Sequence, residues 1–446
     1  MLLLGCIALA GCAMHADDRL ESIVASGVIV AGGVPEPGRL TPAGFPPSGF
    51  DVDLVDAFAK QLGVTVRWHR FDDIQALLRA VAEGQLDLGL GVPLGTATDL
   101  GRVVQSPRYA SVEPVVAYRR GNTRPRRFAD LPPGRWLQPV DAPLLSPPRA
   151  TGAKTEPGRA GSGALPALDV QAALAEVHAG RYAAAVTTRS QLNAMRIMFP
   201  ALAVAFPVPQ AATKDVGLAV ALPRDAGQRF YSRLFVYLRD ARINGRIERL
   251  RRRHSERLAS MNQAALQIFA RHSRERLPRF VSMFRAAARS TGLHWSELAA
   301  LGYQESQWEP NAVSPTGVTG LMMLTRATAR ELGVTNRLDP AESIMAGSRY
   351  LARLYSGFAD DVPSSERLWF AAAAYNLGRA HVRAALRAVS PPGTWNRVRR
   401  QLLEDGNASL ARRQQAVTYV RRTRMYKDAL QFASRRDSLR SRIRHD

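Results

Sequence analysis

The spacing of apolar and polar positions changes about two thirds of the way along the chain. Between residue 20 and about residue 253, short β-branched runs alternate with segments of helical spacing. The runs predict strands at 27–31, 64–68 and 86–90, and the intervening segments predict helices at 52–62 and 74–83. Gly63 and Gly84 follow these helical segments, where glycine favours helix termination. This alternation predicts a mostly parallel sheet with helices on its faces.

Helical spacing dominates the last third of the chain. It predicts helices at 277–290, 295–307, 325–332, 341–357, 365–376 and 378–388, and a further pair between about 395 and 433. A very basic helix at 246–257 and a linker at 255–267 precede this region. We therefore predict an α/β domain at 20–255, an α-rich domain at 268–434 and a basic tail at 435–446.

Glu305 ends one of the predicted helices and is the strongest candidate for catalysis. It lies four residues after Leu301 and seven after Leu298, so the three side chains share one helix face. Desolvation on an apolar face raises the pKa of a carboxyl and makes it a proton donor near neutral pH, as cleavage of a glycosidic bond requires. The alternative is an acid that caps the helix or pairs with a cation.

Two further motifs follow Glu305-Ser306 at ordered spacing, namely Gly320-Leu321-Met322-Met323 and Ala374-Tyr375-Asn376. Together they resemble the lytic transglycosylase domain of the soluble murein transglycosylase and goose-type lysozyme superfamily. Met323 stands where most of that superfamily has Gln. The runs 303–306 and 314–318 are similar to one branch, membrane-bound lytic murein transglycosylase F. The resemblance spans about residues 277–430 and implies a lysozyme-like fold.

The resemblance also implies an activity, cleavage of the MurNAc-GlcNAc β-1,4 bond of peptidoglycan glycan strands. Glu305 would protonate the glycosidic oxygen and then, as carboxylate, accept the proton of the C6 hydroxyl that attacks C1. The product would be a 1,6-anhydro-MurNAc end. The residues expected to bind substrate are Ser306, Met322, Met323, Tyr375, Asn376 and Tyr419.

The sequence offers no clear second carboxylate, and this favours the intramolecular reaction over hydrolysis. Glycoside hydrolases generally use two acids at a defined separation, and no second acid of the last third falls in a recognisable motif. The intramolecular attack needs no water-activating base, and no metal or cofactor is expected because the sequence has no His cluster with ligand spacing. Two alternatives remain: a lysozyme-type hydrolase, and a non-catalytic envelope sensor that binds peptidoglycan or a solute.

Two positions near the C-terminus depart from the family pattern. The run 411–416 aligns with a phrase of the form Ala-Arg-Gly-x-Glu-Ala, but Arg413 replaces the Gly and Gln415 replaces the Glu. Gln415 cannot supply a carboxylate. If the Glu of the family phrase contributes its carboxylate to the active site, that contribution is missing in this chain.

The first domain resembles family 3 periplasmic solute-binding proteins. The resemblance rests on the phrases at 20–27, 49–54, 84–88 and 106–109. It implies an α/β fold of two lobes, the second at about 120–207, with a ligand between them. Asp99 stands where amino-acid binders place the Arg that pairs with the α-carboxylate. We therefore expect the domain to bind a peptidoglycan stem peptide through its amines, or another small ligand, or nothing.

The start of the chain predicts export and a lipid anchor. An apolar run at 2–11, too short to span a bilayer, precedes Cys12 in the lipobox-like phrase Leu9-Ala10-Gly11-Cys12. We read residues 1–12 as a lipoprotein signal peptide, although no Lys or Arg precedes the apolar run. Ala13 after the cysteine favours the periplasmic side of the outer membrane. The alternative is a buried N-terminal strand with an incidental cysteine.

Composition adds little to this interpretation. The net charge is +23, which favours an anionic partner such as an envelope polymer or a membrane surface, but the Arg residues are spread along the whole chain. No nucleic-acid-binding motif is present, and no nucleic acid is expected as a partner. Residues 143–167 are rich in Pro, Gly, Ser and Ala and predict a flexible insertion in the second lobe.

Overall fold

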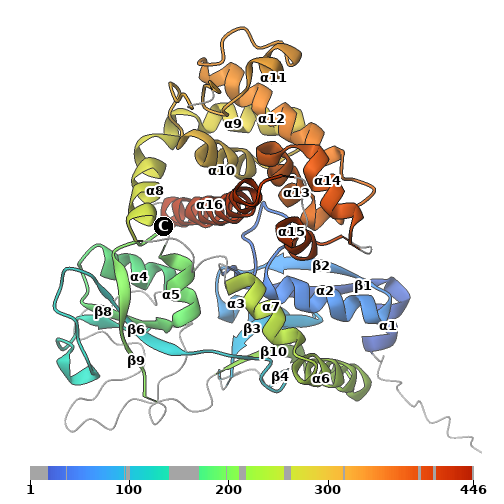
Figure 1. Cartoon of the computed structure of the whole chain (residues 1–446). Helices are drawn as coiled ribbons and strands as arrows, with labels where there is room; N and C mark the ends of the chain where they lie inside the picture. Colours follow the sequence, from blue (N-terminus) through green and yellow to red (C-terminus); the bar gives the residue numbers. More distant parts are fainter. Residues whose placement is uncertain are drawn as a thin grey trace, which may run out of the picture.

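The computed structural model describes residues 19–36, 38–94, 96, 101–139, 170–196, 198–209, 217–255, 263–314, 317–389, 393–404 and 408–443. Three groups of elements are visible in Figure 1: two α/β lobes below and a helical domain above. Each group has its own cluster of buried apolar side chains.

The first lobe is built on a mixed sheet with the strand order β2-β1-β3-β10-β4, and β5 pairs with β10. Its strands are β1 (Val28–Gly33), β2 (Thr65–Arg70), β3 (Leu88–Pro93), β4 (Val103–Gln105), β5 (Ala110–Ser111) and β10 (Gly217–Pro223). Its helices are α1 (Arg19–Ser26), α2 (Phe50–Leu62), α3 (Ile74–Ala82), α6 (Gln228–Ile243) and α7 (Arg246–Ser255). Gly63 ends α2 in the left-handed conformation at φ 74°, as its position predicted.

The second lobe has a smaller sheet with the order β7-β8-β6-β9. Its elements are β6 (Pro114–Arg119), the 3₁₀ turn η1 (Phe128–Asp130), β7 (Trp136–Leu137), α4 (Val170–His178), β8 (Ala184–Thr188), α5 (Arg189–Met195) and β9 (Leu202–Pro207). The lobe begins with β6 at Pro114, somewhat before the predicted residue 120. The chain returns to the first lobe through β10.

The prediction of a mostly parallel sheet was wrong. β1 pairs in parallel with β2 and β3, but β10 runs antiparallel to β3, β4 and β5. In the second sheet β6 is antiparallel to both β8 and β9, whereas β7 and β8 are parallel. Consecutive strands of a βαβ unit are parallel because the helix between them returns the chain to the same end of the sheet. β10 enters the first sheet from the second lobe, without such a crossover, and can therefore run antiparallel.

The last third is helical, as predicted. It contains α8 (Gln263–Glu275), the 3₁₀ turn η3 (Leu277–Arg279), α9 (Val281–Thr291), α10 (Trp295–Ser306), α11 (Arg326–Glu331), α12 (Pro340–Ser356), α13 (Ser364–Leu377), α14 (Arg379–Arg387), α15 (Trp395–Glu404) and α16 (Leu410–Ile443). The long helix α16 packs against α10 and α13, so distant parts of the chain meet around it (Figure 1).

Two segments of the last third differ from the prediction. The predicted linker contains the start of α8, whose Leu266 and Phe269 lie three residues apart and are buried in the helical core. The predicted basic tail is helical through Ile443, because residues 432–443 contain no Gly or Pro and continue α16. Cys12, Asp99 and the predicted insertion at 143–167 lie outside the described residues.

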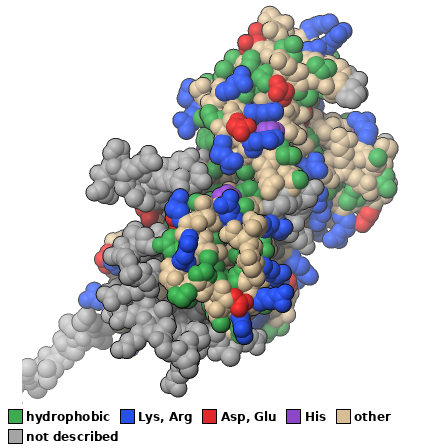
Figure 2. Space-filling model, turned by 90° about the vertical axis from the view of Figure 1, so that its left-hand side faces the viewer, with side chains coloured by type: hydrophobic (Ala, Val, Ile, Leu, Met, Phe, Trp, Pro, Cys, Tyr) green, Lys and Arg blue, Asp and Glu red, His purple; other side chains and the backbone are tan. Residues whose placement is uncertain are grey.

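Side chains of α7 connect the first lobe to the helical domain. Arg253 donates hydrogen bonds to Asp53 of α2 at 3.2 Å and to Glu366 of α13 at 2.8 Å. A second contact joins Phe45 and His294, whose ring centroids lie 4.2 Å apart, next to the first turn of α10. Basic side chains are spread over both parts of the face seen in Figure 2, in keeping with their spread along the sequence.

Candidate active site

Glu305 lies in the last turn of α10, whose apolar face fixes its position. Leu298 and Leu301 are fully buried on the same face, as the spacing predicted. The Glu305 carboxyl is therefore held deep in the domain while part of the residue reaches solvent. Burial raises the pKa of Glu305 from 4.5 to about 7. The group is thus poised to donate a proton near neutral pH and to accept one afterwards.

Two tyrosines from distant helices flank this carboxyl. The hydroxyl of Tyr419 on α16 donates a hydrogen bond to Oε1 of Glu305, which favours the carboxylate and partly offsets the effect of burial on its pKa. Tyr375 on α13 donates its hydroxyl to the carbonyl of Met322 at 2.8 Å. Burial, together with the charge of Glu305, holds the pKa of both phenols well above the ordinary value. Both hydroxyls therefore remain donors across the physiological pH range.

The turn after α10 is shaped by glycine and by close packing. Gly320 has φ 85°, and a Cβ at this position would collide with the carbonyl of Arg337, so only glycine fits. Met323 has φ 46°, an uncommon conformation for a residue with a side chain. Ser306 helps to hold this turn, because its hydroxyl donates a hydrogen bond to the carbonyl of Leu321 at 2.8 Å. The turn is thus tied directly to the residue after Glu305.

The predicted substrate-binding residues fall into two groups. Ser306 is 8% exposed and Met322 is fully buried, so the structure places both side chains in the supporting core of the site. Met322 contributes its carbonyl to Tyr375 and packs its side chain over Gly347. Met323, Tyr375 and Asn376 are partly exposed around the end of α13 and the turn.

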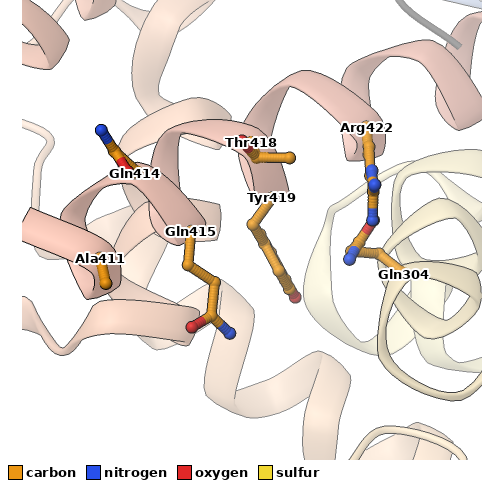
Figure 3. A pocket seen from close by; sticks show the side chains of 7 residues that line it. All are labelled: Gln304, Ala411, Gln414, Gln415, Thr418, Tyr419 and Arg422. Atoms are coloured by element: carbon orange, nitrogen blue, oxygen red, sulfur yellow. The ribbon is translucent and has the colours of Figure 1, made fainter.

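A hollow of about 310 Å³ lies beside this group. It is lined by Gln304, Ala411, Gln414, Gln415, Thr418, Tyr419 and Arg422. Figure 3 shows these side chains along one face of α16, with Gln304 reaching toward them from α10. Tyr419 belongs to this lining and also bonds Glu305, so the carboxyl is one side chain away from the hollow. Among the described residues no cluster of three His, Cys, Asp or Glu side chains could hold a metal ion.

Of the residues that line this hollow, only Tyr419 was predicted to bind substrate. A signal for the others was present, since positions 411, 415, 418 and 422 recur at helical spacing and mark one face of α16. Gln304 was noted only as part of the run 303–306. Apart from Gln415, which was noted as a departure from the family phrase, these positions were not singled out, because such spacing is typical of any solvated helix face.

The two departures from the family phrase have different surroundings. Arg413 donates to the carbonyls of Leu402 at 3.0 Å and Leu403 at 2.8 Å, and so caps the C-terminal end of α15. Gln415 is exposed and lines the hollow one helical turn before Tyr419. A neutral amide at this position brings no negative charge to the hollow beside Glu305.

Comparison with known proteins agrees with this geometry. Residues 282–398 match the family described as the transglycosylase SLT domain. A protein of Alkalilimnicola ehrlichii named membrane-bound lytic murein transglycosylase F 1 is 33% identical over 396 residues, which cover 86% of this chain and 79% of that protein. The chain belongs to the membrane-bound lytic murein transglycosylase F family.

Two further comparisons cover different shares of the chain. The family member of Marinobacter nauticus is 31% identical over 400 residues, which cover 86% of this chain and 77% of that protein. Among solved structures, a mutant of ArgBP from T. maritima is similar over 53% of this chain and 98% of its own, with 18% identity and a TM-score of 0.41. No described helix of this family member is long and apolar enough to cross a membrane.

Proposed function

We propose that this chain cleaves the MurNAc-GlcNAc β-1,4 bond of peptidoglycan without water and leaves 1,6-anhydro-MurNAc ends. As a member of its family it is a peptidoglycan-degrading lytic transglycosylase. The observation that carries the finer proposal is the state of Glu305: a carboxyl with its pKa raised to about 7 by burial, hydrogen-bonded by Tyr419 beside an open hollow.

The proposed reaction uses Glu305 twice. Its protonated carboxyl gives the proton to the glycosidic oxygen as the bond from C1 to that oxygen breaks. The carboxylate that remains then accepts the proton of the C6 hydroxyl as this oxygen bonds to C1, and Glu305 returns to its protonated form. A pKa near 7 suits both steps, because the group must lose and regain a proton at the same pH.

The neighbouring residues have supporting roles in this proposal. Tyr419 stabilises the carboxylate between the two proton transfers through its hydrogen bond to Oε1. Ser306 and the carbonyl of Met322 hold the turn and Tyr375 in place. Met323 and Asn376, which are partly exposed, are the proposed contacts with the sugar and its acetamide.

Digestion of purified murein sacculi tests the reaction. Wild type is expected to release muropeptides with anhydro ends, and Glu305→Gln is expected to release at least about 100-fold less, the usual contribution of general acid–base catalysis. Glu309→Gln, which changes an acid four residues further on and outside α10, is the matched control and should retain activity. Reducing MurNAc ends in the mass spectrum would identify a hydrolase, and equal release by wild type and Glu305→Gln would exclude Glu305.

We also propose that lipidated Cys12 holds the protein at the periplasmic face of the outer membrane. The relatives are named membrane-bound, and the lipobox-like phrase ends at Cys12. In cells grown with labelled fatty acid, Cys12→Ala is expected to incorporate no label and to be absent from the outer-membrane fraction. Unchanged labelling, or a wild-type protein without lipid, would contradict the anchor.

A further inference from the structure

The first lobe contains an arginine held between two carboxylates. Nη1 of Arg39 donates to Glu36 at 2.7 Å, and Nη2 donates to Asp51 at 2.6 Å. Tyr109 donates its hydroxyl to the other oxygen of Asp51 at 2.8 Å. The side chains of Arg39, Glu36 and Asp51 are only 16%, 15% and 3% exposed. Ion pairs of this geometry are directional and strong because guanidinium and carboxylate are both planar.

The position of this cluster in the sheet is informative. From β1 the chain passes through α2 to β2 on one side and then through α3 to β3 on the other, so the order reverses between β1 and β3. At such a switch point α/β proteins form a crevice outside the carboxyl ends of the strands, where ligands bind. Glu36 follows the end of β1 by three residues. Near the end of β3, a Cβ on Gly91 would collide with the Arg39 guanidinium.

The second lobe reaches the same cluster. Gln191 of α5 is 8% exposed, and its Nε2 donates to Glu36 at 3.4 Å. The amide is oriented by its own lobe, since its oxygen accepts hydrogen bonds from the Thr188 amide at 3.0 Å and the Thr187 hydroxyl at 3.2 Å. A hydrogen bond therefore joins α5 to the charged cluster across the two lobes.

We propose that Arg39 is an internal ligand, whose guanidinium occupies the crevice between the lobes and holds them together without a free solute. The site formed by Glu36, Asp51 and Tyr109 is then specific for a guanidinium group, supplied here by the chain itself. A planar cation satisfies both carboxylates at once, whereas an amino-acid carboxylate would be repelled by them. The module thus acts as a constitutively closed unit and not as a receptor for amino acids.

Chemical rescue of the Arg39→Ala variant tests this inference. The change leaves two carboxylates facing an empty space, and we expect Tm of the full chain to fall by at least about 4 °C. Methylguanidinium at low millimolar concentration should then raise Tm saturably and bind the variant in calorimetry, while wild type should show neither effect. Arg189→Ala is the matched control, because Arg189 forms an exposed bidentate pair with Glu113 and its loss should not create a site.

Three results of the rescue experiment would overturn the inference. They are saturable binding of L-arginine or another amino acid by wild type, failure of methylguanidinium to bind Arg39→Ala, and equal rescue of Arg189→Ala. If Arg39→Ala does not fold, Arg39→Lys carries the same test, since one ammonium group cannot make both planar pairs. Its Tm is expected to fall while that of Arg189→Lys does not. A Tm for Arg39→Lys equal to that of wild type would reject the proposed site.

Discussion

Replacement of Glu305 by Gln is expected to stabilise the helical domain, by an amount that depends on pH. In the folded protein, burial raises the pKa of Glu305 from 4.5 to about 7, so the folded state disfavours the carboxylate relative to the unfolded chain. Gln is neutral at every pH, similar in shape, and can still accept the hydrogen bond of Tyr419. The variant therefore keeps the packing of the site and removes only the buried charge.

The magnitude follows from the pKa values. A shift of about 2.5 units, at about 1.4 kcal/mol per unit, corresponds to about 3 kcal/mol. Below pH 4.5 the acid is protonated in both states and no penalty arises. Between pH 4.5 and about 7 only the unfolded chain releases the proton, so the stability of wild type falls as pH rises. Above about pH 7 the whole penalty is present.

Calorimetric melting of wild type and Glu305→Gln at about pH 5 and about pH 9 measures this difference, because linkage makes it pH-dependent. The variant should melt close to wild type at the lower pH and roughly 6 to 12 °C higher at the upper pH, for a domain of this size. Tyr375→Phe, made in wild type and in Glu305→Gln, is a suitable control. The hydroxyl that it removes bonds the Met322 carbonyl and not Glu305, so the pH-dependent difference in Tm should remain. A Tm difference that is the same at both pH values would refute the assignment of a desolvated Glu305.

Other perturbations test the surroundings of the same carboxyl. Tyr419→Phe removes a bond that lowers the pKa of Glu305, so the alkaline limb of the pH–activity profile should move up by about one unit; an unmoved limb would contradict the bond. Gly347→Ala places a methyl group against Met322 and should lower the free energy of unfolding, measured in urea, by about 1–3 kcal/mol. An unchanged free energy would show that Met322 can move to accommodate the methyl group. Ser306→Ala leaves a buried carbonyl unpaired and should cost about 1–3 kcal/mol, with activity falling in parallel; full activity and stability would remove Ser306 from the support of the turn.

Much of the helical domain was predictable because its signals are local. Leu298, Leu301 and Glu305 share a face in any regular helix, and α10 begins and ends within one residue of the predicted limits. Gly320 was also marked by the sequence as the first residue of a family motif, and its φ of 85° is a conformation that favours glycine. In these cases the property depends on neighbours within a few residues, and spacing along the chain is sufficient to infer it.

Other features of the site required the assembled fold. Tyr419 lies 114 residues from Glu305, and only the packing of α16 on α10 brings its hydroxyl to the carboxyl. The same packing decides that Met322 faces the core while Met323 does not, although the two are adjacent and chemically identical. A local pattern cannot distinguish these outcomes, because they depend on which surfaces meet.

The N-terminal module shows the same division. Alternating β-branched and helical segments identified the strands β1, β2 and β3 and the helices α2 and α3, but the sense in which β10 enters the sheet was not encoded in that pattern. Arg39 is one of many arginines in the sequence, and only the folded lobe places its guanidinium between Glu36 and Asp51. The sequence by itself determined the family, the helices of the last third, the first elements of the N-terminal module and the candidate acid, because these follow from local order. Tertiary structure decided the pKa of that acid and the partners of the buried charges, because desolvation and ion pairing arise only when distant segments exclude water together.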